Sequence, residues 1–164
     1  MKTIIKQYPV PCDTNIAWTA GFFDGEGCIH IEPLYSRRNK KTRPTYQLYI
    51  RIGNTHLPSL NHLKNIWGGV IMPNGAKEHK NQQWYWHAWS TLAVHILRLC
   101  LSYLVTKKHQ AMVAIDFQER KTYLRENAHM PYKKLPDWYY DEDEFWSRKL
   151  KEIRNEALVT VAIR

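Results

Sequence analysis

Cysteine is scarce in this chain, and its few copies follow no recognisable pattern. The three cysteines among the 164 residues are odd in number and lack the spacing of a zinc site: Cys12, Cys28 and Cys100. This excludes a disulfide framework and predicts reduced thiols in an intracellular protein.

The chain also lacks a long apolar segment, and no run of residues approaches the length of a membrane span. Residues 1–6 have neither the apolar stretch nor the cleavage site of a signal peptide. We therefore expect an intracellular protein without a membrane partner. A prokaryotic cytoplasm and an organelle, chloroplast or mitochondrion, are both consistent, because an organellar gene product needs no transit peptide.

Acidic residues are outnumbered, with 15 Asp and Glu against 24 Lys and Arg and a formal net charge of +9. A basic balance of this size favours a polyanionic partner, usually nucleic acid, over a merely soluble basic protein. Several enzyme classes lack support, because the chain has no glycine-rich phosphate loop and no nucleophile elbow. Three histidines spaced eight residues apart do not suit a metal site either: His79, His87 and His95.

What the sequence does contain is a helix with an unusually small face. Four residues recur at i, i+3, i+4 and i+7, and three of them are small: Ala17, Ala20, Gly21 and Asp24. Three larger residues of the same helix are expected to enter a core: Ile16, Thr19 and Phe23. A face without bulky side chains allows a second backbone to approach closely.

The same helix is expected to end near Asp24, at a glycine-flanked acid. Gly25 and Gly27 are poor helix residues and suit a tight exit. Glu26 between them holds its carboxylate beside exposed backbone carbonyls at the helix end. Carboxylate and carbonyl oxygens are the ligands of hard divalent cations, so this end is a candidate metal site.

Further along, the pattern predicts an α+β protein of order α-β-β-α-β-β-α-α-α, as one domain over residues 1–164 with a core of about 13–155. An extended arm precedes helix one, which starts at Asp13, Thr14 or Asn15. Strands are expected at 27–33, 45–52, 70–72 and 82–89, and helices at 58–67, about 90–100, about 107–117 and 141–155. Residues 127–135 read as a loop and 156–164 as a tail of undefined conformation. The outward row of strand 82–89 is undetermined, because tryptophans alternate there with Tyr85 and His87.

Two segments suit contact with DNA. Five of the seven residues from Arg37 to Arg43 are basic and join two strands, so they favour phosphate contacts over a merely solvated hairpin tip. The strand at 45–52 alternates cleanly, with three residues expected in the core: Leu48, Ile50 and Ile52. Gln47, Tyr49 and Arg51 face outward, and Gln and Arg are side chains that make bidentate contacts to purine edges.

The stretch from Ala20 to Gly27, AGFFDGEG, resembles the signature of LAGLIDADG homing endonucleases, and the element order matches that family over about residues 13–155. The resemblance implies an αββαββα(α) fold with a curved, antiparallel, four-stranded DNA-binding sheet. It also implies site-specific hydrolysis of both DNA strands with Mg²⁺, which Ca²⁺ or Mn²⁺ replaces in vitro. The signature occurs once, and single-copy members are homodimers. The small face is then the dimer seam, and the target is pseudo-palindromic.

The resemblance also assigns roles to the motif residues. Glu26 matches the essential acid and becomes the metal ligand, aided by the Gly25 carbonyl. Many members have Asp at this position, and the longer arm of Glu changes the metal geometry. Asp24 matches the first acid of the motif, which is mostly structural.

Two further residues match active-site positions outside the motif. Asn54 lies where a polar residue orders water, with His56 as a second candidate. Lys107, which aligns better than Lys108, matches the lysine that stabilises charge or orders water. An arginine that the family often has in this pocket has no assigned position here.

The resemblance and the strand patterns together give the set of predicted DNA contacts. They lie on the outward face of the strands, in the basic loop and in the turn at 73–81: His30, Glu32, Arg37, Arg38, Lys40, Lys41, Arg43, Gln47, Tyr49, Arg51, Lys77 and Lys80.

Two rival interpretations stay open at this stage. One is a non-cleaving nucleic-acid-binding protein, such as an intron-splicing maturase that binds RNA or a transcriptional regulator. The other is an interaction domain that uses the small-faced helix only to dimerise. Non-cleaving relatives often lose the motif acid, so the presence of Glu26 favours a nuclease. A pure interaction domain leaves the charge of +9 and the basic loop unexplained.

Overall fold

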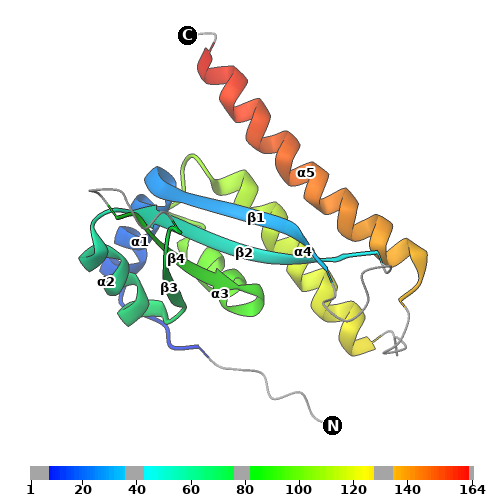
Figure 1. Ribbon diagram of the computed structural model, residues 1–164, viewed down its shortest axis with the longest axis horizontal. Helices are drawn as coiled ribbons and strands as arrows, with labels where there is room; N and C mark the ends of the chain where they lie inside the picture. Colours follow the sequence, from blue (N-terminus) through cyan, green and yellow to red (C-terminus); the bar gives the residue numbers. More distant parts are fainter. Residues whose placement is uncertain (1–7, 36–42, 76–81, 128–134, 163–164) are drawn as a thin grey trace.

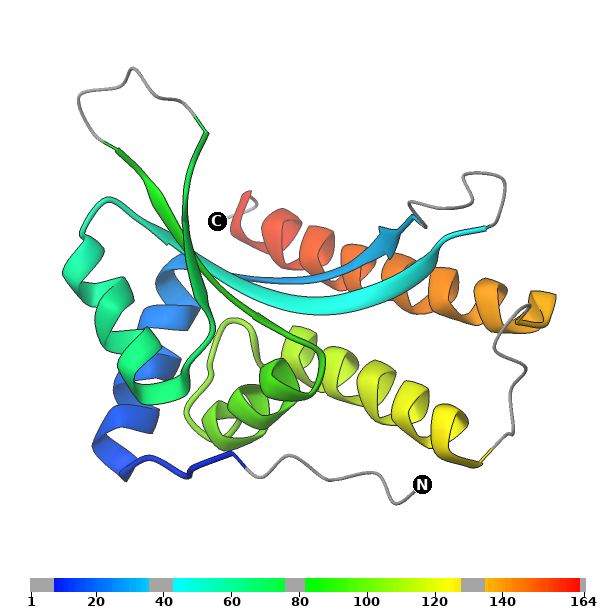
Figure 2. The same ribbon diagram turned by 60° about the horizontal axis from the view of Figure 1, so that its bottom comes forward.

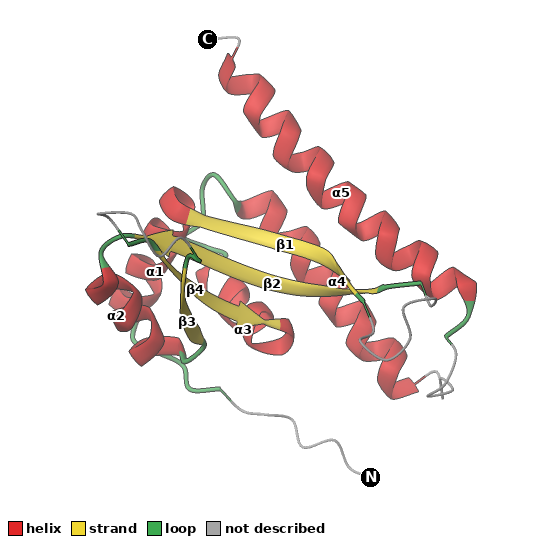
Figure 3. Cartoon of the chain, in the orientation of Figure 1, coloured by secondary structure: helices red, strands yellow, loops and turns green. Residues whose placement is uncertain are grey.

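The computed structural model describes residues 8–35, 43–75, 82–127 and 135–162. For residues 157–162 it describes the backbone alone. These residues form an α+β fold (Figure 1, Figure 3). Its elements follow in chain order: α1 (Asp13–Glu26), β1 (Gly27–Leu34), β2 (Thr45–Asn54), α2 (Leu57–Trp67), β3 (Val70–Pro73), β4 (Trp84–Trp89), α3 (Ser90–Cys100), α4 (Lys108–Asn127) and α5 (Asp137–Ala162).

The four strands form one antiparallel sheet in the order β1-β2-β4-β3, which confirms the predicted fold class. Figure 2 shows the sheet curving over helices α1 to α4, which cover one of its faces. Helix α5 runs along the β1 side of the sheet in that view. An antiparallel sheet with one covered face requires alternating apolar and polar residues, which is the pattern of β2.

The core lies between this sheet and the helices. Three residues of β2 are fully buried, as the alternation predicted: Leu48, Ile50 and Ile52. The structure also determines the orientation of β4, which the sequence left undetermined. Trp86 and Ala88 face the core with no exposed surface, so His87 belongs to the open face.

Helix α5 is the largest departure from the predicted elements. It runs from Asp137 to Ala162 rather than over 141–155, and so includes most of the tail from residue 156, whose conformation the sequence did not determine. Pro136 lies directly before it, and proline is well tolerated at a helix start. Helix α4 also exceeds its predicted range and continues to Asn127. The predicted loop at 127–135 lies mostly outside the described residues.

Helix α5 packs along α4 and the edge strand β1, and it extends beyond the sheet (Figure 1). Ser147 donates a hydrogen bond from its hydroxyl to the Ile31 carbonyl at 2.8 Å, and Arg154 donates to the Ile29 carbonyl. These carbonyls belong to the outer edge of β1, where no strand pairs with them. The helix therefore covers a sheet edge that would otherwise be open to other chains.

The helices of the described ranges differ from membrane spans. None of them combines the length and the apolar character needed to cross a bilayer.

Candidate functional site

The end of α1 is fastened to the loop before α4 by Asp24. Its carboxylate accepts hydrogen bonds from the backbone N–H groups of Val105 at 2.7 Å, Thr106 at 3.3 Å and Lys107 at 3.0 Å. The Thr106 hydroxyl adds a fourth bond at 3.0 Å. Burial opposes ionisation of Asp24, but these hydrogen bonds outweigh it and lower the pKa of the carboxyl. Asp24 therefore joins two segments of the site.

Lys107 is brought to the same helix end. Besides its backbone bond to the Asp24 carboxylate, its ammonium donates to the Asp24 main-chain carbonyl. Asp24 is two residues before Glu26, the last residue of α1. The structure thus places the predicted charge-stabilising lysine and the predicted metal-binding acid at one terminus of α1.

Strand β2 places Asn54 near the same end of α1. Gly27, which follows Glu26, pairs with Ile52 of β2, and Asn54 lies two residues further along that strand. The Asn54 side-chain carbonyl accepts from the His56 backbone N–H at 2.8 Å. Its amide N–H groups donate no hydrogen bond to any of the described residues, so they can contact a ligand.

His56 contacts residues at the start of α2. Its Nδ1 lies 2.8 Å from the Ser59 hydroxyl, and the residue occupies the N-cap position of that helix. The ring therefore serves the turn between β2 and α2 in this conformation.

Oxygen donors suited to a divalent ion lie at the end of α1. Glu26 and Gly25 are exposed at the end of α1, and they supply the carboxylate and carbonyl oxygens that such an ion prefers. No group of three or more His, Cys, Asp or Glu side chains suited to a metal occurs among the described residues. The residues present fit a hard cation in type.

The exposed face of α1 differs from the predicted one. Ala20, predicted at the dimer seam, is fully buried in the chain's own core, so this part of the prediction was wrong. The reason is that the buried residues of α1 themselves recur at i, i+3, i+4 and i+7: Ile16, Thr19, Ala20 and Phe23. A buried hydrogen bond of 2.9 Å from the Trp67 indole to the Thr19 hydroxyl fixes this orientation.

The outer side of α1 carries glycines between aromatic rings. Gly21 and Gly25 are exposed, and a Cβ at either would meet nothing within 4 Å. Trp18, 38% exposed, packs against Phe22 and against His62 of α2, with ring centroids 5.2 and 4.8 Å apart. Ala17 and Asp24, the other predicted seam residues, are half-buried.

The open face of the sheet collects the predicted base-reading residues. Their register brings neighbours side by side, since His30 pairs with Tyr49 and Glu32 with Gln47. The face is joined by residues of β4 that the sequence could not assign: Tyr85, His87 and Trp89. A row of rings crosses this face, with His30 stacked on Tyr49 at 4.5 Å and His87 on Trp89 at 5.4 Å.

Glu32 fixes two of these rings. It accepts from the Tyr49 hydroxyl at 2.9 Å and from Nδ1 of His30 at 3.0 Å. Burial and the bond to Glu32 raise the pKa of Tyr49 to about 12. Burial lowers the pKa of His30 despite Glu32, and burial together with Arg51 and His30 lowers the pKa of His87. Both imidazoles are therefore neutral at pH 7, each with one donor and one acceptor nitrogen.

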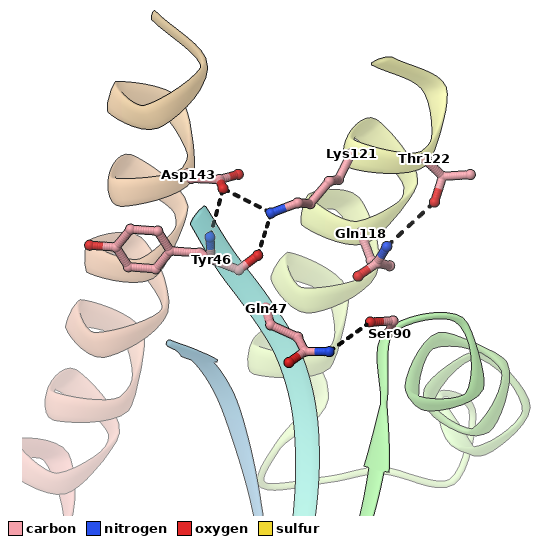
Figure 4. A network of polar contacts seen from close by, with 7 residues as sticks. All are labelled: Tyr46, Gln47, Ser90, Gln118, Lys121, Thr122 and Asp143. Carbon is pink, nitrogen blue, oxygen red and sulfur yellow. Dashed lines mark hydrogen bonds and ion pairs between the residues drawn. The ribbon is translucent and has the colours of Figure 1, made fainter. Parts of the chain in front are cut away.

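Two more predicted contacts are held by neighbouring elements. The Gln47 amide donates to the Ser90 hydroxyl at 3.4 Å (Figure 4), and Ser90 has a positive φ of 47° at the β4–α3 junction. The Arg51 guanidinium lies over the Tyr85 ring, 4.7 Å from its centroid. Arg43 is bound to α5. The remaining predicted contacts lie outside the described residues: Arg37, Arg38, Lys40, Lys41, Lys77 and Lys80.

Comparison with known proteins gives one family match. A sequence model described as LAGLIDADG endonuclease matches residues 19–120, which span the site from α1 to α4. A search of curated proteins returned no match for the chain.

Solved structures with the same fold include three homing endonucleases. The homing endonuclease I-CvuI, in complex with the I-CreI target in the presence of Mg, is 18% identical, with a TM-score of 0.65 and coverage of 85% of this chain and 82% of that one. The archaeal intron-encoded I-Vdi141I, complexed with DNA, is 14% identical, with a TM-score of 0.56 and coverage of 85% and 98%. The I-SmaMI LAGLIDADG homing endonuclease bound to cleaved DNA is 15% identical, with a TM-score of 0.59 and coverage of 90% and 47%.

Proposed function

The chain belongs to the LAGLIDADG endonuclease family, and from this premise we propose that it is a homing endonuclease that hydrolyses both strands of a long pseudo-palindromic DNA site. It acts as a homodimer and depends on a divalent metal ion, Mg²⁺ in the cell. One observation carries the proposal. Glu26 projects from the exposed end of α1, and Lys107 is tied to that same end through Asp24.

DNA recognition is the task of the open sheet face. Gln47 and Arg51 offer bidentate groups to purine edges, while the neutral imidazole of His87 offers one donor and one acceptor. The basic residues from Arg37 to Lys41, between β1 and β2, contact phosphates and fix the register of the protein on the duplex. DNA is present in the structures of I-CvuI, I-Vdi141I and I-SmaMI, which supports DNA as the ligand here.

Catalysis is the task of the end of α1. Glu26 and the Gly25 carbonyl hold the divalent ion, which when bound neutralises phosphate charge and activates water. The Lys107 ammonium, positioned by the Asp24 carbonyl, stabilises the negative charge that develops on the scissile phosphate. The free amide of Asn54 orders water near the same phosphate.

A second copy of the chain completes this arrangement. One chain supplies Glu26 as the motif carboxylate for a metal ion, because the Asp24 carboxylate is bonded to residues 105–107, and the described residues hold no larger ligand cluster. Gly21 and Gly25 on the outer side of α1 allow a second α1 to approach closely. Two Glu26 carboxylates then meet at a two-fold axis, where they would hold the divalent metal together, and the symmetry yields one cut in each strand.

The test combines selection with one isosteric substitution. A randomised DNA library is incubated with Mg²⁺, and the cleaved sequences are recovered to identify the target. Glu26→Gln should abolish cleavage of that target while binding in Ca²⁺ stays within a few-fold, because the amide keeps the shape but loses the anionic ligand. Glu152→Gln, an exposed acid on α5, is the matched control and should cleave normally.

Two outcomes contradict the proposal. Equal loss of binding and cleavage in Glu26→Gln would give the residue a structural role. Sequence-specific binding by the natural chain without Mg²⁺-dependent cleavage would instead support the non-cleaving nucleic-acid-binding alternative.

A further inference from the structure

A buried ion pair fixes the start of β2 to the two long helices. The Lys121 ammonium of α4 lies 2.8 Å from the Asp143 carboxylate of α5 and also donates to the Tyr46 carbonyl. Asp143 accepts from the Tyr46 backbone N–H at 2.8 Å (Figure 4). The two charged side chains are only 21% and 7% exposed. Both backbone polar groups of Tyr46 are thus held, and the chain entering β2 has one defined path past α5.

Arg43 lies on that path, three residues before Tyr46, and its guanidinium is bound by α5. It lies 2.6 Å from the Asp141 carboxylate and 3.7 Å from that of Glu144. It also lies over the Tyr140 ring, 5.3 Å from the centroid. Asp141 and Glu144 are three residues apart, so they share one face of the helix.

These contacts matter because Arg43 closes the basic run that begins at Arg37. A guanidinium between two carboxylates cannot bind a phosphate without breaking those pairs. The first eight residues of α5, from Asp137 to Glu144, contain five acids in a chain whose net charge is +9. The negative charge of α5 is therefore concentrated where it competes with DNA for Arg43.

The pairs are poorly suited to a purely stabilising role. Arg43, Asp141 and Glu144 have side chains 42%, 66% and 54% exposed, and exposed pairs add little to folding. The buried pair of Lys121 and Asp143 already fixes the strand. What the exposed pairs do control is the charge that Arg43 presents to solvent.

We propose that Asp141 and Glu144 are positioning residues that hold Arg43 against α5 and so weaken binding to DNA of arbitrary sequence. The inference rests on the proposed function only in taking duplex DNA as the ligand. Non-specific binding is carried by phosphate contacts, so removing one arginine from the phosphates lowers it directly. Contacts to base edges on the sheet are left in place, and discrimination between target and other DNA rises.

The experiment measures binding to a random-sequence duplex over a series of salt concentrations. Asp141→Asn should bind this duplex about two- to fivefold more tightly, the range of an exposed pair. The dependence of log affinity on log salt should steepen by about 0.9, which corresponds to one added phosphate contact. The double variant, Asp141→Asn with Glu144→Gln, should bind the random-sequence duplex more tightly than Asp141→Asn alone.

Glu142→Gln is the matched control. It removes the same charge from the same turn of α5, but Glu142 pairs with Arg120 of α4 instead of Arg43. If only the net charge of the protein mattered, Asp141→Asn and Glu142→Gln would raise the affinity for the duplex equally. A second control repeats Asp141→Asn in an Arg43→Ala background, where the gain should vanish because the released group is absent.

The outcomes separate the two proposals. Equal gains in Asp141→Asn and Glu142→Gln, or a gain that persists without Arg43, would overturn this inference alone. Failure of the natural chain to bind any duplex would overturn the proposed function as well. Selective tightening in Asp141→Asn, with a steeper salt dependence and cancellation by Arg43→Ala, supports it.

Discussion

At the scale of single residues, Gly27 marks the point where α1 becomes β1. A Cβ placed there would overlap the Phe23 ring and the Phe23 carbonyl. Phe23 is 2% exposed and cannot move aside without disturbing the core. The glycine is therefore required by close packing, and it determines where the strand starts and where Glu26 is presented.

Gly27→Ala should destabilise the fold by about 1–3 kcal/mol, the usual range for an overpacked core. Gly25→Ala, two residues earlier, is the control, because its added methyl meets open space within the chain. Alanine in a helix should instead add about 0.5–1 kcal/mol of stability. Urea denaturation measures both, and equal stability of the two variants would show that the packing around Phe23 adapts.

Residue chemistry was predictable where one local rule decided it. The alternation of β2 identified the core row and the open row, because a half-buried strand allows only one assignment. In β4 both rows are aromatic, so hydrophobicity could not separate Trp86 from His87. Only the pairing with β2 shows that His87 lies on the open face. The hydrogen bonds of Asp24 to residues 105–107 were likewise invisible, since they join segments 81 or more positions apart.

At the scale of elements, α5 supports one edge of the sheet and the start of β2. It covers the edge of β1 and fixes the start of β2 through Asp143 and Lys121. The sequence indicated an amphipathic helix but not its length or partner, because helix ends depend on tertiary contacts. Burial lowers the pKa of Lys121, and Asp143 opposes this shift because its carboxylate favours the charged ammonium.

Asp143→Asn should destabilise the protein by about 2–4 kcal/mol, because it leaves the Lys121 charge buried without its counter-ion. Glu119→Gln is the control, since Glu119 pairs with Arg98 across an exposed surface and its loss should cost under about 0.5 kcal/mol. The midpoint of urea unfolding compares the two. A similar small effect for both would mean that water reaches Lys121 and replaces the carboxylate.

The predicted dimer seam shows how far an element can be oriented from sequence. The small residues of α1 predicted one face that packs against a second copy, but the structure divides these residues between the core and the surface. Ala20 contacts the chain's own core, while Gly21 stays exposed. Ala20 and Gly21 are consecutive in sequence, so only the position of the sheet and of Trp67 determines which of them points outward.

At the scale of the whole molecule, the proposed dimer depends on the outer side of α1. This side combines two exposed glycines with two aromatic rings: Trp18, Gly21, Phe22 and Gly25. Gly21→Leu fills the space that a second α1 needs, yet its side chain meets nothing within 4 Å of the Cβ in its own chain. The chain should therefore fold normally, with an unchanged circular dichroism spectrum, and remain monomeric in light scattering.

Cleavage should be lost with dimerisation, because a single Glu26 cannot form the paired site. Glu152→Leu adds similar apolar bulk to the exposed surface of α5 and should leave both properties intact. A Gly21→Leu protein that still dimerises and cleaves would place the two-fold axis on another surface, and the pairing of two Glu26 residues would fail with it.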